Sequence, residues 1–144
     1  MELPDGQLAI GAVVTLIIVA IQALSTLAVI RIAHWADRFF SHRYRYLLLL
    51  GVVTMAGTLL TCAHLLETGV WALTYAACGV TEPGDAYYLA FVNFTTLGYG
   101  DLRPAEPWRL IGPLTSANGM LMFGWSTAVL YAVLSKALEI LRLD

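Results

Sequence analysis

The chain has 144 residues, of which 59% are hydrophobic and only 12% are charged. A soluble domain carries about 25% charged residues, so this composition argues against a soluble globular protein and indicates an integral membrane protein. The formal net charge is −2, and we expect no nucleic-acid partner.

Three apolar stretches are long enough to cross a bilayer, which takes about 20 residues. They cover residues 8–30, 46–66 and 110–134, and the second is expected to continue as a helix to about residue 77. The N-terminus opens with acidic rather than basic residues, and its first apolar run is longer than that of a typical signal peptide. We therefore expect the first span to be retained.

Residues 31–45, RIAHWADRFFSHRYR, connect the first two spans and are rich in arginine and aromatic residues. They predict either a loop that fixes the topology, which we favour, or a helix lying on the inner membrane surface. The arginines are not repeated at every third position within a span, which argues against a voltage sensor of that kind. We divide the chain into an N-terminal transmembrane helix with its cytoplasmic connector, 1–45, and a pore module, 46–144.

The charged residues are distributed unevenly around the spans. Four of the eight basic residues lie in residues 31–45, and two more, Lys136 and Arg142, follow the third span. Seven of the ten acidic residues lie at the N-terminus or between the second and third spans. The positive-inside rule then predicts a multi-pass protein of the cell (inner) membrane with its N-terminus outside and its C-terminus in the cytoplasm.

A polar stripe marks the outer end of the second span. His64, Glu67, Trp71 and Tyr75 are spaced so that they share one face of a helix. We expect this face to dock against the short helix described below or the third span. A charge on Glu67 is costly near lipid, so its side chain either pairs with another group, such as Arg109, or reaches the lipid headgroups. One histidine and one glutamate are too few for a metal site.

The two cysteines are Cys62 and Cys78, sixteen residues apart. If both lie on one helix, they are separated by about 24 Å and cannot form a disulfide within one chain. We interpret them as buried free thiols.

A segment too short to span the membrane precedes the third span. Residues 80–85 contain a proline, a glycine and an aspartate, which are typical of turns. The ten residues 86–95 suit a re-entrant helix capped by Asp85. Residues 102–107 contain two prolines and lead to the third span. Non-helical backbone at membrane depth requires a lining of protein or water.

Residues 95–101, between these segments, read TTLGYGD. Glycine adopts positive φ easily, so Gly98 and Gly100 let successive carbonyls point the same way, as they do in a potassium filter. The segment resembles the TVGYG filter of the tetrameric potassium channel superfamily, with Leu97 where valine is commoner. The spacing of the polar stripe on the second span also resembles small bacterial members of that superfamily. A chance turn between two helices is the alternative interpretation.

The resemblance implies a role for each residue of this loop. The carbonyls of Thr96, Leu97, Gly98 and Tyr99 would coordinate K⁺, with the Thr96 hydroxyl at the inner mouth. Gly100 would complete the filter. The side chains of Leu97 and Tyr99 would point away from the pore and brace the filter from behind.

The resemblance also implies residues that support the filter. Asp101 would lie at the outer mouth and bond to Tyr88, which stands where the family often has tryptophan. Val92 and Thr95, from the end of the short helix, would hold the filter in place.

The third span is the most polar of the three and is expected to line the pore. Asn118 is one of its polar residues, and Gly119 and Gly124 allow a bend or close helix packing. Small and hydroxyl-bearing residues also favour helix packing in membranes, so lining, hinge and packing roles stay open for these positions.

The sequence therefore predicts an all-α integral membrane protein with three transmembrane helices, a re-entrant pore helix and a filter loop per subunit. The resemblance covers residues 46–135 and implies a homotetramer that conducts K⁺ passively, with membrane lipids as its other partners. A poorly selective cation channel and a non-conducting membrane subunit are the alternatives. We expect no enzymatic activity and no cofactor besides the permeant K⁺.

Overall fold

The computed structural model describes residues 5–38 and 45–142, and within these ranges the regular elements are four helices. They are α1 (Asp5–Arg38), α2 (Arg45–Ala77), α3 (Ala86–Phe94) and α4 (Ile111–Arg142). The predicted all-α architecture is confirmed. Cys62 and Cys78 are free, as expected, but the expected burial is wrong, because Cys62 is exposed and Cys78 is only partly buried.

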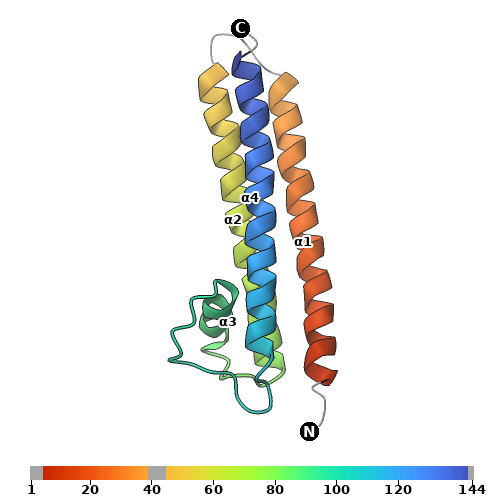
Figure 1. Cartoon of the computed structure of the whole chain (residues 1–144), viewed down its shortest axis with the longest axis vertical. Coiled ribbons are helices and arrows are strands. Elements are labelled where there is room, and N and C mark those ends of the chain that lie inside the picture. The colour runs from red at the N-terminus through yellow and green to blue at the C-terminus, as the bar shows by residue number, and fades with distance from the viewer. Residues whose placement is uncertain (1–4, 39–44, 143–144) are drawn as a thin grey trace.

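The three long helices lie side by side, and the short α3 lies beside the end of α2 and the beginning of α4 (Figure 1). α1 contacts both α2 and α4 along the bundle. The N-terminal end of α1 and the loops around α3 lie at one end of the bundle, and the C-terminal end of α4 lies at the other (Figure 1). The three long helices therefore alternate in direction along the bundle.

Each long helix contains a segment suited to crossing a membrane. These segments are Asp5–Trp35, Leu49–Ala77 and Ile111–Glu139, and they contain 18-residue stretches with mean hydropathies of 2.5, 1.8 and 1.4. Large apolar side chains such as Leu16, Leu50 and Leu73 are exposed along them. Helices that are apolar on their exposed faces are typical of membrane spans, which confirms that this is a membrane protein.

The connector differs from the favoured expectation. α1 continues to Arg38, so the first eight residues of the expected loop extend the first helix. The segment RIAHWADR contains no glycine or proline to end a helix, and the loop interpretation is wrong for it. Residues 39–44 lie outside the described part of the chain.

The second helix ends close to the predicted position, and a glycine explains why. Gly79 has φ of +65°, and the amides of Gly79 and Val80 donate to the carbonyls of Ala76 and Tyr75. This pair of bonds is a Schellman motif, which satisfies the last carbonyls of a helix. The chain then turns sharply toward α3.

The short helix begins at the expected residue, but the expected cap is absent. Asp85 occupies the N-cap position with φ −98° and ψ −8° and makes no side-chain capping bond. Its backbone is helical rather than extended, which keeps its carboxylate away from the free amides. Asp85 takes part only through its carbonyl, which accepts a hydrogen bond from Leu89.

The main apolar core lies at the end of the bundle that contains α3. It joins all four helices, and its largest buried members are Ile18, Trp71, Tyr75, Leu89, Phe94, Ile111 and Met122. α3 is therefore packed against the long helices through buried side chains, and its last residue, Phe94, is fixed by the core. This rigid end positions the loop that follows.

Candidate functional site

The loop after α3 has a regular backbone alternation. Thr96, Gly98 and Gly100 have φ values of +58°, +59° and +77°, whereas Leu97 and Tyr99 between them do not have positive φ. Positive φ at every second residue reverses the twist of the chain at each step. Such an alternation lets successive carbonyl oxygens face the same side of the strand, as an ion filter requires.

Thr96 is a site residue whose conformation the sequence did not reveal. A β-branched residue at positive φ is an outlier, and such strain persists only where surrounding contacts impose it. The amide of Thr96 donates to the Asn93 carbonyl at 3.0 Å, and the amide of Leu97 donates to the Val92 carbonyl at 2.9 Å. The end of α3 thus fixes the start of the loop. Gly98 and Gly100 are two residues apart, and Thr96 lies two residues before Gly98. This spacing could have predicted the positive φ of Thr96.

The supporting residues lie next to the loop. The Tyr88 hydroxyl donates to Asp101 Oδ2 at 2.6 Å, which is the bond expected from the sequence. This bond holds the pKa of the Asp101 carboxyl below its ordinary value. Val92 is buried, and Thr95 Oγ1 donates to the Phe91 carbonyl at 2.8 Å. These contacts tie both ends of the loop to α3.

The two bulky side chains of the loop are uncovered in the single chain. Leu97 is 51% exposed and Tyr99 is 68% exposed. Their own chain therefore covers these two side chains only in part, and the bracing role expected of them stays a prediction.

The C-terminal half of the polar stripe, Trp71 and Tyr75, lies where three helices meet. Tyr75, fully buried on α2, shares a hydrogen bond of 2.7 Å with Thr115 of α4 and accepts one of 3.1 Å from Asn93 of α3. Ser116 of α4 donates to the Asn93 carbonyl at 2.8 Å. Trp71 is also fully buried. This part of the stripe docks against both segments that the sequence analysis named.

The partner of Glu67 is different from the one considered. Glu67 is fully buried, and its Oε2 lies 2.9 Å from His64 Nδ1. Arg109 lies 3.4 Å from Glu106 instead, and these two side chains are 78% and 76% exposed. The expectation that Glu67 pairs with another group is confirmed, but Arg109 is not that partner, and the alternative in which Glu67 reaches the headgroups is wrong. The partner was one turn away on the same stripe.

We expect Glu67→Ala to destabilise the protein strongly, and Glu67→Gln to do so less. Breaking a buried pair costs about 3–5 kcal/mol because the remaining polar group is left without its partner. Arg109→Ala is the matched control, since an exposed pair contributes less than about 1 kcal/mol. Thermal unfolding in mild detergent measures all three variants. Equal melting temperatures for Glu67→Ala and Arg109→Ala would contradict this account.

The candidate residues of α4 separate into two environments. Asn118 is buried, and its Nδ2 donates to Thr15 Oγ1 of α1 at 3.0 Å, so it faces a helix of its own chain and does not support the expected pore-lining role. Gly119 is packed against the end of α3, where an added Cβ would lie 1.7 Å from the Phe94 carbonyl oxygen. Gly124 is exposed and has open space around it. The helix is continuous through both glycines.

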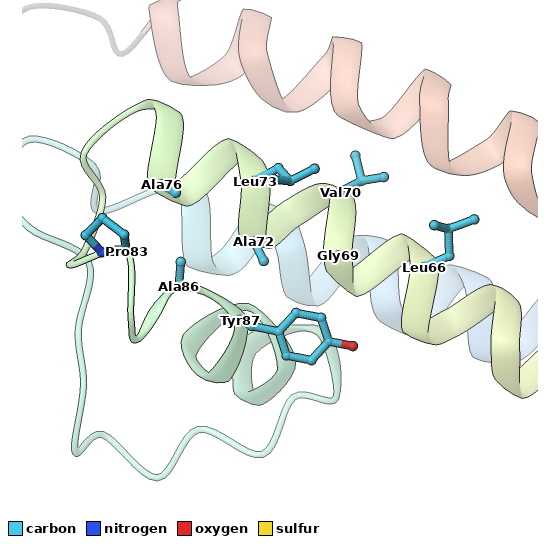
Figure 2. A pocket seen from close by; sticks show the side chains of 9 residues that line it. All are labelled: Leu66, Gly69, Val70, Ala72, Leu73, Ala76, Pro83, Ala86 and Tyr87. Atoms are coloured by element: carbon cyan, nitrogen blue, oxygen red, sulfur yellow. The ribbon is translucent and has the colours of Figure 1, made fainter.

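An open groove of about 400 Å³ lies between the end of α2 and the beginning of α3. Figure 2 shows its side chains, among them Leu66, Val70 and Leu73 of α2 and Tyr87 of α3. The Tyr87 hydroxyl donates to the Leu65 carbonyl at 3.2 Å. No acidic or basic side chain lines the groove, and the described residues contain no cluster of three or more His, Cys, Asp or Glu that could hold a metal ion. The groove is therefore unsuited to bind an ion.

A family model described as "Ion channel" matches residues 47–136, more than half of the chain. The chain belongs to this ion channel family. The match runs from the start of α2 through α3 and the TTLGYGD loop into α4, and it leaves α1 outside. It confirms the resemblance to the pore-loop channel superfamily.

A curated relative is similar to part of the channel. It is the inward rectifier potassium channel Kirbac3.1 of Paramagnetospirillum magnetotacticum, 35% identical over 83 residues. The similar region covers 52% of this chain and 28% of the relative, so the two proteins share only a portion of their lengths. No solved structure was found to match.

Proposed function

We propose that the channel conducts K⁺ passively and selectively across the cell membrane. The observation that carries this proposal is the alternation of positive φ at Thr96, Gly98 and Gly100, in a loop that reads TTLGYGD. Rings of backbone carbonyls are the means by which potassium channels replace the hydration shell of the ion. The family match and the potassium channel named among its relatives support the same function.

The proposed ion sites use the backbone and need no cofactor. The carbonyls of Thr96, Leu97, Gly98 and Tyr99 would coordinate K⁺, and Gly100 would shape the outer end. In this arrangement α3 is a re-entrant pore helix. The end of the bundle with α3 and the N-terminus faces outside, and the C-terminus faces the cytoplasm, in keeping with the basic residues at that end.

The proposed assembly is a homotetramer surrounded by membrane lipids. One loop cannot surround an ion, and closed rings of identical subunits are the common solution. The exposed side chains of Leu97 and Tyr99 would be covered by neighbouring copies, which would supply the bracing that the single chain lacks.

The assembly makes a direct prediction for the purified protein. In mild detergent, native mass spectrometry should detect four copies of the 15.7 kDa chain under conditions that retain flux. A monomer or dimer that still conducts would contradict the proposed assembly.

The rival function is a poorly selective cation channel, and the reason to consider it is Leu97. Leucine in place of valine would change the packing behind the filter, although the alternation of positive φ is present. Flux into liposomes under separate K⁺ and Na⁺ gradients tests the proposal. We expect K⁺ flux with little Na⁺ flux; comparable fluxes would favour the rival function, and no flux of either ion would indicate a non-conducting subunit.

A further inference from the structure

α1 lies outside the region matched by the ion channel family, yet polar side chains bind it to that region. Near its start, Gln7 Nε2 donates to the Pro107 carbonyl at 2.6 Å, and Gln7 Oε1 accepts from the Leu110 amide at 2.9 Å. Further along, Gln22 is a fully buried amide in a stretch without charged residues. Burying an amide is unfavourable unless it is hydrogen-bonded. Within the described residues the Nε2 of Gln22 has a partner and its Oε1 has none, so the partner of Nε2 indicates its role.

Gln22 begins a hydrogen-bond chain that crosses three helices. Its Nε2 donates to Ser126 Oγ of α4 at 2.7 Å, and Ser126 Oγ lies 3.0 Å from His64 Nε2 of α2. His64 Nδ1 lies 2.9 Å from Glu67 Oε2. Serine, histidine and a carboxylate in this order also form the nucleophilic triads of hydrolases. Here Ser126 is buried between helices, and its hydroxyl accepts a hydrogen bond from Gln22. The hydrogen-bond chain therefore serves to link the helices and does not form a nucleophilic triad.

His64 connects this chain to the end of the pore helix. Its ring centroid lies 4.7 Å from that of Phe123 and 6.2 Å from that of Phe94, and the two phenyl rings lie 5.6 Å apart. Phe94 is buried and is the last residue of α3. Thr95 and Thr96, the start of the TTLGYGD loop, follow it directly.

The surroundings of the hydrogen-bond chain are apolar, which strengthens each of its bonds. No Asp, Glu, Lys, Arg or His occurs in residues 6–30 of α1 or in residues 111–135 of α4. Polar contacts are stronger in such a low-dielectric interior, and an unpaired group there is correspondingly costly. Without Gln22, the Ser126 hydroxyl loses its fixed donor and can turn to a carbonyl of its own helix, as Thr127 does toward Phe123. His64 would then lose the partner of its Nε2.

We infer that Gln22 is a positioning residue for the filter, acting from a helix outside the family's pore module through Ser126 and His64 on Phe94. This inference rests on the proposed function, because it assigns to α1 a role in holding the conducting loop. α1 is then a working part of the pore and not only a peripheral anchor. Its position along α4 in Figure 1 agrees with this role.

The test compares Gln22→Met with Thr15→Val. Methionine keeps the volume of Gln22 but removes the hydrogen bond to Ser126. Thr15→Val is the matched control, because it removes another bond between α1 and α4, the one to Asn118, and leaves the chain through His64 intact. Both variants should melt below the parent. Only Gln22→Met should lower the ratio of K⁺ to Na⁺ flux, and we expect a change of several-fold.

A double-mutant cycle between Gln22→Met and Glu67→Gln tests the chain without any flux. Gln22 and Glu67 lie at opposite ends of the hydrogen-bond chain. Independent sites that share no partner have additive effects on the free energy of unfolding. We expect non-additive changes in thermal unfolding. Additive changes, or equal flux ratios for Gln22→Met and Thr15→Val, would overturn the inference. A parent protein without K⁺ flux would instead overturn the proposed function, while the cycle would still decide whether the chain acts as a unit.

Discussion

Gly119→Ala should abolish K⁺ flux and lower the thermal stability of the channel. The added Cβ would lie 1.7 Å from the Phe94 carbonyl oxygen and 2.7 Å from its carbonyl carbon. Both atoms belong to the backbone, so α4 must move away from the end of α3. Overpacking of this kind costs about 1–3 kcal/mol, and the shift occurs directly before the loop of positive-φ residues.

Gly51→Ala is the matched control for this substitution. Gly51 is also helical, on α2, but a Cβ there meets nothing within 4 Å. Alanine is favoured over glycine in a helix by about 1 kcal/mol, so this variant should melt at or above the parent temperature and retain flux. A Gly119→Ala variant that melts and conducts like Gly51→Ala would show that the close approach to Phe94 is unimportant. Melting curves and liposome flux are the two measurements.

Replacing Gly98 or Gly100 with alanine should abolish K⁺ flux or its preference over Na⁺. Both glycines have positive φ, and an added Cβ at either meets no atom closer than 4.0 Å. The effect would therefore arise from backbone strain, about 1–2 kcal/mol per residue, which favours a different carbonyl orientation. Global stability should change little compared with the change in flux.

Leu97→Val is the control in the same loop. It restores the residue that is commoner in the superfamily at a position without positive φ, so K⁺ preference should be kept. Liposome flux under K⁺ and Na⁺ gradients compares the three variants. Selective flux like that of the parent in both glycine variants would mean that this loop is not the filter.

The features that depend on local sequence were predictable. The three spans follow from the length of their apolar runs, and the short helix from a run too short to cross a bilayer. The conformations of Gly98 and Gly100 follow from the freedom of glycine. The bond between Tyr88 and Asp101 followed from the resemblance of the loop and its flanks to the superfamily.

The features that depend on contacts between helices were not predictable. Glu67 has potential partners on several segments, and although His64 lies one turn away on the same helix, only the packing of α2 against α4 places Ser126 at the other ring nitrogen of His64. The role of Gly119 depends on how closely α3 approaches α4. The continuation of α1 beyond residue 30 was missed because clustered arginines were interpreted as a loop, although they are compatible with a helix.

The central claim, that the TTLGYGD loops of four chains form one K⁺ filter, is tested most directly by mixing subunits. Parent and Gly98→Ala chains would be co-expressed in equal amounts, purified, and assayed for K⁺ flux in liposomes per incorporated chain. If all four loops must be intact, the flux falls to about one sixteenth of the parent value, because random assembly yields few all-parent tetramers. A flux of about one half would mean that each chain conducts independently, and it would contradict the account.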